Sequence, residues 1–537
     1  MINLNTNRSF SMVCTMIVLA TIACAALVQA QVYTQLYNFD CVKVGCNPNQ
    51  PGLLAQGQDG GLYSTMPTQI SGDGTVIGCS PSGLCNAIFQ FTDVNSSPTS
   101  GLSLGFDGNF YGTAETGGAG RTGTVFKVSG GAMTVLHTFT DGTDGAYPWA
   151  PPVQAPDGNI YGVTYNGSNP GKAYKITPSG VFSVLATLPS GTQAPLVVGI
   201  DGKLYGTTPY GGDFNRGTVF QMTTKGIVKI IHSFGADGLV PIGPVMQASD
   251  GKFYGTTSGG GSFNQGIVYQ VTTGGTYKVL HNFQTATEGT GSTTGLVQGS
   301  DKFLYGVIAG GGINGLGSLY KVNTTGTTFA VLHSFDKLTG GTPFSTPTLH
   351  TNGTIYGVTH TGGSENSTYG VLYSFDAGLK PFASLVVLSS GKVGDAVGIL
   401  GQGFTSVTGV QFGSGPGTFT VVNDTYMIAS PTTGATTGPV TVLEPGGNLV
   451  TPQTYKVIPA ILSFSPASGA VGTQVQITGT SFDQASAVSF GGGAKAAFTV
   501  NSDTQITATV PTGAKTGTIS VTTKGGKATS KTKFTVN

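Results

Sequence analysis

One short motif recurs seven times along the first two-thirds of this 537-residue chain. The copy that starts at Asp201 reads DGKLYGTT, and every copy has a tyrosine near its centre, 44 to 51 residues from the next. A regular period of this length, built from short β-type runs, is typical of the blades of a propeller. We therefore predict an all-β fold with a seven-bladed β-propeller. The recurrent tyrosines are Tyr63, Tyr111, Tyr161, Tyr205, Tyr254, Tyr305 and Tyr356.

Each repeat unit contains four short runs that we expect to form strands. In the fourth unit these runs begin near Pro195, Leu204, Gly217 and Ile230. An Asp-Gly turn joins the first two runs, which is a strong hairpin signal, and a Gly-rich loop joins the second and third. Side chains alternate along a strand, and a blade is covered on both faces. We therefore expect the recurrent tyrosine to lie in the core, beside a glycine that allows close packing between sheets.

The fourth-strand motif, VLHSF at Val331, is missing from the first and the seventh units. The seventh unit ends with its third strand, VLYSF, at residues 371–375. Residues 35–39, QLYNF, have the fourth-strand pattern but precede the first unit. We expect residues 35–39 to complete the last blade, because such closure removes the exposed edges of the array.

Composition supports a turn-rich β protein with an ample core. Charged residues make up only 9% of the chain, while 87 residues are glycine and 38% are hydrophobic, in short alternating runs. The 24 basic and 23 acidic side chains nearly cancel, and no basic run occurs. The chain therefore lacks the charge pattern of a nucleic-acid-binding protein, and we expect no nucleic-acid partner.

The N-terminus has the three parts of a secretory signal peptide. Arg8 precedes an apolar run over residues 12–28, and Val28-Gln29-Ala30 supplies a small-residue cleavage site. We expect a signal peptide over residues 1–30, cleavage after Ala30, and a secreted, cell-surface or periplasmic protein. An uncleaved anchor helix fits less well, because the run is short and contains two threonines, and Thr21 is a poor match to a lipoprotein signal at Cys24. We expect no membrane span in the mature chain.

Four cysteines remain outside the predicted signal peptide, namely Cys41, Cys46, Cys79 and Cys85. An even number in an exported chain indicates disulfides, although the sequence leaves three connectivities open. Pairing Cys41 with Cys46 and Cys79 with Cys85 would close short loops, whereas the long-range pairings would tie the N-terminal strand to the first blade. A zinc site is the weaker interpretation, because the C-x4-C and C-x5-C spacings are loose for one.

The repeats resemble the Gly-rich, kelch-like tandem repeats called GloVer repeats in bacterial exported proteins. The resemblance covers roughly residues 33–378 and rests on the motifs DGxLYGTT, GGxxNxGTVF and VLHSF. It supports a propeller over residues 31–378. Surface attachment is common among such proteins, but neither a terminal apolar helix nor a sorting signal follows here.

A different repeat follows the linker at residues 377–381. Residues 393–424 match residues 471–502 at an offset of 78. Both copies are similar to IPT/TIG domains, through VQFG at Val410 and VSFG at Val488. Short alternating strands over about 80 residues also fit an immunoglobulin-like sandwich. We therefore predict two immunoglobulin-like β-sandwich (IPT/TIG) domains, over residues 379–457 and 458–537.

No catalytic pattern stands out of the repeats. The Asp-Gly turns could suggest calcium, but each supplies one carboxylate where aspartate is favoured anyway. The Gly-rich loops lack the Lys-Ser/Thr of a P-loop, and no GxSxG, HExxH or recurring acidic pair occurs. We expect no catalytic residue, metal or other cofactor, with calcium as the weaker alternative. The recurrent histidines should pack between blades, since their places in different blades prevent convergence on one ion; they are His137, His232, His281 and His333.

The longest loops are expected on one face of the propeller. In this strand order, the Gly-rich loops and the loops that leave the fourth strands emerge on the same face. Loops on a rigid scaffold are where binding residues gather. An alternative is that Tyr147 and Trp149, the only tryptophan, merely fill a gap between blades. The candidate ligand-binding residues are Asp141, Asp144, Tyr147 and Trp149, with Asn215 and Asn264 from the Gly-rich loops.

Two classes of function fit these features. The first is an exported, non-enzymatic binding or adhesion protein, with the loop face as a platform for a carbohydrate or cell-surface ligand and the C-terminal domains as a spacer. The second is a secreted polysaccharide-active hydrolase or lyase. Fold alone does not separate them. The absence of a recurring acid/base pair favours the first, and the sequence indicates no oligomeric state.

Overall fold

The computed structural model describes residues 31–48, 53–68, 74–92, 97–165, 170–363, 369–386 and 390–537. Within these ranges the protein is built of strands and one short 3-10 helix, η1 (Phe404–Ser406). The all-β class predicted from the sequence is confirmed. The predicted signal peptide, including its cleavage site after Ala30, lies outside the described residues. No helix in the described part of the chain is long and apolar enough to cross a membrane.

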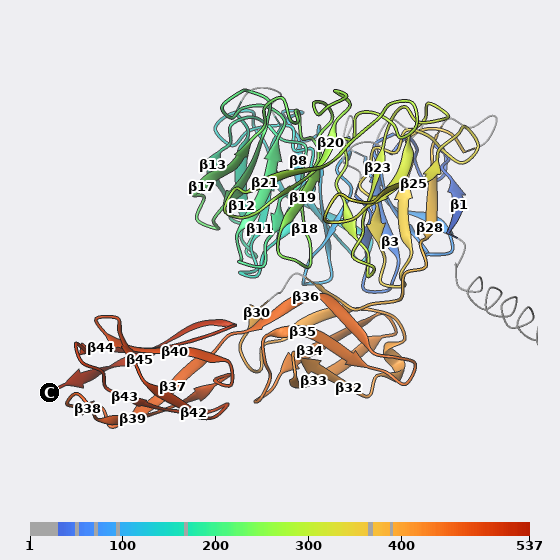
Figure 1. The fold of residues 1–537 in the computed structure, drawn as a ribbon. Coiled ribbons are helices and arrows are strands. Elements are labelled where there is room, and N and C mark those ends of the chain that lie inside the picture. The colour runs from blue at the N-terminus through green and yellow to red at the C-terminus, as the bar shows by residue number, and fades with distance from the viewer. Residues whose placement is uncertain are drawn as a thin grey trace, which may run out of the picture.

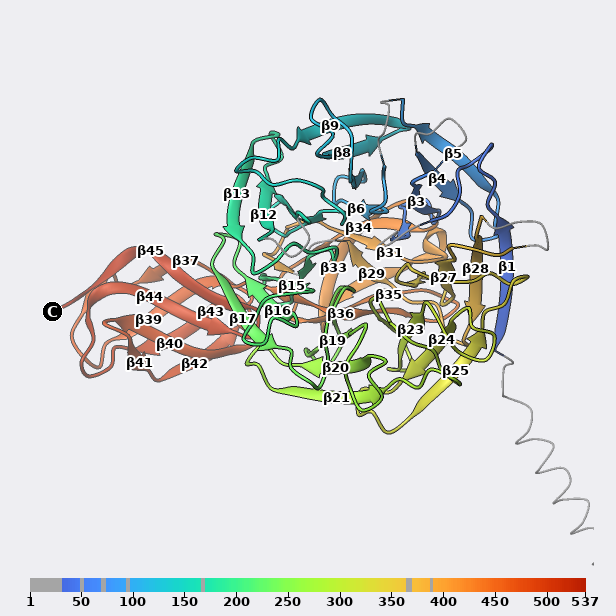
Figure 2. The same cartoon turned by 90° about the horizontal axis from the view of Figure 1, so that it is seen from above.

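Seven four-stranded antiparallel sheets form a ring in the N-terminal two-thirds of the protein, as Figures 1 and 2 show. The strands of the first three sheets are β2 (Ala55–Gln56), β3 (Leu62–Met66), β4 (Thr75–Cys79) and β5 (Cys85–Gln90); β6 (Ser103–Leu104), β7 (Phe110–Ala114), β8 (Thr124–Ser129) and β9 (Ala132–Thr138); and β10 (Val153–Gln154), β11 (Ile160–Val163), β12 (Lys172–Ile176) and β13 (Phe182–Thr187). The first unit therefore has a fourth strand, β5, although it lacks the VLHSF motif.

The remaining four sheets have the same strand order, but the fourth strand of the last sheet comes from the N-terminal end of the repeat region. Their strands are β14 (Val197–Val198), β15 (Leu204–Thr208), β16 (Thr218–Met222) and β17 (Val228–Ser233); β18 (Met246–Gln247), β19 (Phe253–Thr256), β20 (Ile267–Val271) and β21 (Tyr277–Asn282); β22 (Val297–Gln298), β23 (Leu304–Ile308), β24 (Ser318–Val322) and β25 (Phe329–Ser334); and β26 (Thr348–Leu349), β27 (Ile355–Val358), β28 (Val371–Asp376) and β1 (Val32–Asn38).

Strand β1 closes the ring by pairing antiparallel with β28. Val32 lies opposite Asp376 and Asn38 lies opposite Val371, with a shift in register at Leu36. The same bulge recurs where fourth strands meet third strands elsewhere, for example at Ile231 between β16 and β17. In Figure 2, β1 lies on the outside of the ring, in line with β5 and β25. The N-terminal strand thus takes the place of a fourth strand in both pairing and shape.

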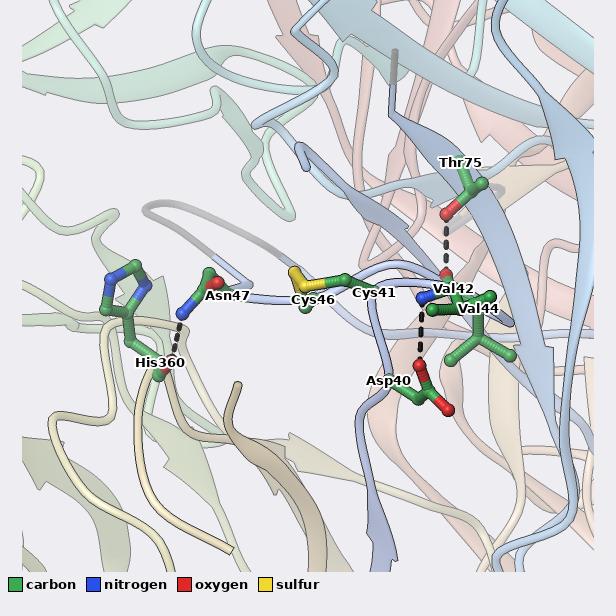
Figure 3. The surroundings of a disulfide bond; sticks show 8 residues. All are labelled: Asp40, Cys41, Val42, Val44, Cys46, Asn47, Thr75 and His360. Atoms are coloured by element: carbon green, nitrogen blue, oxygen red, sulfur yellow. Dashed lines mark hydrogen bonds between the residues drawn. A yellow bond between two sulfur atoms is a disulfide. The ribbon is translucent and has the colours of Figure 1, made fainter. Parts of the chain in front are cut away.

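A small disulfide loop fastens this closure. Cys41 bonds to Cys46, directly after β1, and Figure 3 shows the loop between the last and the first sheet. On one side, Asn47 donates a hydrogen bond to the carbonyl of His360 (3.1 Å). On the other, Thr75 donates one to the carbonyl of Val44 (2.6 Å). The second disulfide joins Cys79 and Cys85 across β4 and β5, so both pairings are the local ones.

Each part of the DGKLYGTT motif has a structural role in the fourth sheet. The Tyr205 side chain is fully buried, and its hydroxyl donates to the Asp201 carboxylate (2.9 Å). Gly206 lies under the Phe220 ring of the neighbouring strand, where a Cβ would come within 2.7 Å of the ring. The glycine is therefore required by a ring within its own sheet rather than by the next sheet. Thr207 donates to the carbonyl of Gly243 in the next repeat unit (3.0 Å).

The recurrent histidines pack between sheets, as predicted. The His137 ring stacks on Phe182 of the next sheet, with centroids 3.6 Å apart and planes 4° apart. The other three stacks have the same form, with centroids 3.7–3.8 Å apart, and they join His232 to Tyr277, His281 to Phe329 and His333 to Tyr33.

Two β-rich modules follow the ring. The first forms one eight-stranded sheet around a core that includes Phe412 and Tyr455. The second forms sheets of four and five strands around a core that includes Phe490 and Phe534. The strands of the first module are β29 (Ser384–Val386), β30 (Ser390–Gly391), β31 (Val397–Leu400), β32 (Gly409–Phe412), β33 (Gly415–Asn423), β34 (Tyr426–Pro431), β35 (Gly438–Leu443) and β36 (Leu449–Val457). Those of the second are β37 (Ala460–Ser465), β38 (Ser468–Gly469), β39 (Gln474–Thr480), β40 (Ala485–Gly491), β41 (Ala494–Ala496), β42 (Phe498–Ser502), β43 (Gln505–Thr509), β44 (Lys515–Thr523) and β45 (Gly526–Val536).

The first module docks on the face of the ring that carries the Asp-Gly turns, which we call the turn face (Figure 1). Thr425 donates to the carbonyl of Gln58 (2.7 Å), beside the turn of the first unit. Across the ring, the Lys456 ammonium donates to the carbonyl of Ile200 in the fourth unit. Strands of this module are visible through the centre of the ring in Figure 2. The module therefore lies across the centre of the ring on its turn face.

Candidate functional site

The opposite side of the ring, which we call the loop face, is formed by two sets of loops that interlock. The loop that leaves each fourth strand crosses toward the ring centre and meets the end of the next unit's second strand. In one case, the Tyr147 carbonyl accepts a hydrogen bond from the Tyr165 amide (3.0 Å). Val240 accepts one from Ser258 (3.2 Å) and Thr342 one from His360 (3.1 Å) in the same way. The two predicted loop sets are thus joined into one surface.

An aromatic pair stands where one of these crossing loops turns into a first strand. The Trp149 and Tyr165 rings lie 4.9 Å apart with a tilt of 36° between their planes. Both side chains are half-buried. Phe344 and His360 form the equivalent pair in the last unit, with centroids 5.5 Å apart. The loop face therefore offers partly exposed rings at matching places in two units.

A carboxyl group lies against the Trp149 indole. Glu115 follows β7, one residue after the end of the recurrent motif of the second unit. Burial raises the pKa of the Glu115 carboxyl, and interaction with the Trp149 side chain opposes this effect in part. The pKa of the nearby Tyr165 is also raised, mainly by burial and further by Tyr210 and Glu115. Acidic, phenolic and indole groups therefore share one neighbourhood.

The two aspartates of the crossing loop lie at its outer end. Asp144 accepts hydrogen bonds from the Thr140 hydroxyl (2.6 Å) and contacts His137 Nε2 (3.1 Å). Burial alone would raise the pKa of Asp144, but the bonds from Thr140 and His137 hold it below its usual value. Asp141 is exposed and has a left-handed backbone (φ 59°). Asp144 therefore braces the loop and fixes His137 in its stack.

Asn215 and Asn264 do not share a loop with Trp149. They belong to the Gly-rich loops of the fourth and fifth units, and both have left-handed backbones. The Asn215 amide oxygen accepts from the Gly211 amide (2.9 Å), and that of Asn264 accepts from Gly260 (3.2 Å). The side-chain oxygens thus hold their own loops in shape, which leaves their NH2 groups as the atoms that a ligand could contact.

Sequence reasoning did not single out Glu115 and Tyr165. Both directly follow copies of the recurrent motif, at a position that varies more between units than the Tyr-Gly core of the motif does. Variation at one fixed place in a repeat was the signal that could have identified them. Tyr147, by contrast, contributes mainly its backbone, which bonds to Thr122 and Tyr165.

The carboxylates of the Asp-Gly turns are already engaged within the motif. In the second unit, Asp107 accepts from the Tyr111 hydroxyl (2.7 Å) and from the Asn109 side chain (2.6 Å). Across the described residues, no group of three or more His, Cys, Asp or Glu side chains is placed to hold a metal ion.

Two family models match the chain. The Gloeobacter/Verrucomicrobia repeat matches residues 26–196 and 191–422. The chain belongs to this repeat family. The IPT/TIG domain matches residues 459–536, which confirms the predicted resemblance of this part of the chain to IPT/TIG domains. The first C-terminal module lies outside that IPT/TIG match, and the second Gloeobacter/Verrucomicrobia repeat match extends into it.

The solved structures that resemble this chain have low sequence identity to it. A fungal alcohol oxidase of the AA5 family, in complex with copper, is 13% identical over 95% of this chain and 100% of that chain (TM-score 0.44). The surface glycan-binding protein PbSGBP-B from Prevotella bryantii is 18% identical over 28% of this chain and 38% of that chain (TM-score 0.22). Neither similarity assigns a function here. No curated protein matches the chain.

Proposed function

We propose that this protein is an exported, non-enzymatic binding protein whose loop face holds a neutral polar ligand, of which a glycan is the leading case. The observation that carries the proposal is the half-buried Trp149–Tyr165 pair, 4.9 Å between rings. Aromatic rings offer a flat apolar platform for the face of a sugar, and nearby polar groups orient its hydroxyls. In this proposal Glu115 and the Asn215 and Asn264 amides are the polar groups.

The proposed domain division supports this role. Residues 31–378 form the binding ring, and residues 379–457 and 458–537 form a spacer on the turn face, away from the ligand. A spacer on that side leaves the loop face open. The two disulfides suit an exported protein, because such bonds persist in oxidising compartments.

One observation favours the alternative, a polysaccharide-active hydrolase or lyase. Burial raises the pKa of Glu115, and a carboxyl of raised pKa can serve as a general acid. A glycosidase of the common type needs a second carboxylate about 5–10 Å away. The carboxylates of the crossing loop are Asp141 and Asp144, and Asp144 is bound to His137 at the outer end. Binding therefore fits this arrangement better than hydrolysis.

The test is to screen the oxidised protein against a panel of neutral and acidic polysaccharides, recording both retention and release of reducing ends. We expect retention without release. Trp149→Ala should weaken retention by about 5- to 150-fold, if the indole contributes the roughly 1–3 kcal/mol that an aromatic side chain contributes when a nucleic-acid base stacks on it. Ile313→Ala is the control, because Ile313 is 75% exposed on the Gly-rich loop of the sixth unit, which contributes no proposed ligand contact. Equal losses in both variants, or retention that survives Trp149→Ala with Tyr165→Ala, would place the ligand elsewhere.

A further inference from the structure

A cavity separate from the loop face lies at the turn face of the ring. This partly open cavity of about 570 Å³ lies between the turn face of the ring and the first C-terminal module. Its walls come from the first strands β2, β6, β18, β22 and β26, and its floor comes from β29, β31 and β36. Cavities of roughly 300–1,000 Å³ with walls from two domains are typical of small-molecule sites.

The lining of this cavity is mostly apolar and uncharged. Leu104, Val297 and Leu349 line it from the ring, and Phe382 and Leu385 line it from the module. Among the residues that the structure describes, the lining includes no Asp, Glu, Lys, Arg or His. A charged ligand would lose its hydration here without gaining a counter-charge, which costs far more than burial of a neutral one. The cavity therefore selects for a neutral ligand.

Most of the polar side chains in the wall are already satisfied. The Gln247 amide donates to the carbonyl of Gly251 (2.8 Å) and accepts from the Ile200 amide (2.8 Å). Gln298 and Gln56 make equivalent bonds, to Ser249 and to Thr351. These glutamines clasp one repeat unit to the next, so they hold the wall in place rather than offering themselves to a ligand.

Gln453, on the floor, is different. It lies in β36, and its amide nitrogen makes a long contact of 3.4 Å with the Ser384 hydroxyl. Its amide oxygen is buried and has no hydrogen-bond donor among the described residues. An unpaired buried acceptor costs free energy that a donor would recover. Gln453 lines the cavity, and rotation about its soft terminal torsion exchanges the positions of the amide oxygen and nitrogen.

We propose that this cavity binds a neutral, largely apolar small molecule that carries a hydrogen-bond donor, an O–H or N–H group, directed at Gln453. The walls bury the apolar body and Gln453 recognises the donor. Because the ring supplies the walls and the module supplies the acceptor, the ligand also ties the module to the ring. This site is independent of the loop face, so either proposal can fail without the other.

The test uses two fluorescent probes with the same aromatic skeleton. N-phenyl-1-naphthylamine is neutral and has one N–H donor, whereas 1-anilinonaphthalene-8-sulfonate adds a negative charge. Titration of the oxidised full chain should give saturable binding of the neutral probe to one site. The sulfonate should bind at least tenfold more weakly. Equal affinity for both probes, or no saturable binding of the neutral one, would overturn the proposal.

Two variants test the contacts. Gln453→Leu should weaken the neutral probe about fivefold, since a hydrogen bond contributes about 1 kcal/mol net. The N-methylated probe, which lacks the donor, should bind both proteins alike. Val297→Trp should place an indole inside the cavity and weaken binding of the neutral probe, and a melting temperature close to that of the parent would show that the variant still folds. If that variant unfolds, the Gln453→Leu comparison decides.

Trp149→Ala is the control for location. It alters the loop face, so it should leave the affinity for the neutral probe unchanged. Loss of probe binding in this variant would move the site to the loop face and contradict the proposal.

Discussion

The rings of His333 and Tyr33 stack face to face, 3.7 Å between centroids and 5° between planes, although the two residues come from opposite ends of the repeat region. In other sheets, the stacking partner of the histidine is the ring at the start of the next fourth strand, such as Phe329 beneath His281. Tyr33 therefore reproduces across the closure the contact that joins neighbouring units elsewhere. The ring is therefore closed by the same histidine–aromatic stack that joins neighbouring repeat units.

The first prediction concerns this closure. Tyr33→Ala should lower the free energy of unfolding by about 2 kcal/mol, below the 3–5 kcal/mol typical of a fully buried ring, because Tyr33 is only half-buried. Chemical denaturation would measure it. Val32→Ala is the control, since Val32 in the same strand is 49% exposed and should change stability little. Similar losses in the two variants would show that the stack adds nothing to closure.

The second prediction concerns pH. Burial lowers the pKa of His137, and likewise the pKa of His232 and of His333, despite the opposing attraction of a nearby aspartate in each case. The unfolded chain therefore binds more protons than the folded one just below the unfolded pKa of about 6.5. The free energy of unfolding should be highest above about pH 7 and should fall as the pH drops below about 6.5 toward 5.

Melting temperatures at pH 7.5 and pH 5.5 would check the pH prediction. A variant with tyrosine at these three histidine positions should show a smaller difference in melting temperature, because tyrosine does not titrate between these pH values. Tyrosine should fit there, since Tyr37 already occupies the equivalent place in β1. The carboxyl partners do not confound this window. The pKa of Asp144 and that of Asp336 are held below their usual values by hydrogen bonds, so both stay ionised until the solution is more acidic. An unchanged slope in the variant would assign the effect to other groups.

The repeat made most of the ring predictable, and it also limits what the sequence can reveal. The place of residues 35–39 could be inferred because QLYNF has the pattern of VLHSF, and β1 even repeats the bulge at Leu36. The disulfide pairing could not, because four cysteines allow three connectivities and the sequence does not give the distances between them in the folded ring. Pairing depends on the turn at Asp40–Gly45, which only the folded closure defines.

The sites were harder to predict than the fold. Trp149 was identifiable as an unusual residue in a long loop, but its partner Tyr165 follows the next copy of the motif and meets it only in the folded ring. The cavity could not be predicted from the sequence for the same reason. Leu104 and Gln453 are far apart in sequence, and the docking of one module across the ring brings them to the same cavity. Contacts between units are not encoded within a unit.

The third prediction concerns the disulfide loop at the closure. Replacing Cys41 and Cys46 by serine should cost more stability than replacing Cys79 and Cys85. Chain entropy gives each short loop a similar value, about 2 kcal/mol. The first loop also holds the hydrogen bonds to Thr75 and His360 that join the first and last sheets. Denaturation of both double variants would compare them, and equal losses would mean that those bonds survive without the disulfide.

The last prediction concerns the Asp-Tyr pair inside the repeat. The Tyr205 hydroxyl donates to Asp201 (2.9 Å), and Asp201 also accepts from the Lys203 amide (3.1 Å). Tyr205→Phe should cost about 1 kcal/mol, because it leaves the carboxylate one donor short in a partly buried site. Asp201→Ala should cost about 2 kcal/mol, since both donors then lose their acceptor.

Asp201→Asn should be nearly neutral, and the chain itself gives the reason. In the seventh unit Asn352 takes the place of the aspartate, and its amide donates to the Tyr356 hydroxyl (3.0 Å) with the direction of the bond reversed. Lys203→Ala is the control: its ammonium lies 3.2 Å from Asp201 in an exposed pair, which should contribute at most about 0.5 kcal/mol. Chemical denaturation of the four variants would rank them. A loss in Asp201→Asn as large as that in Asp201→Ala would show that the negative charge, rather than the hydrogen bond, is what the motif requires.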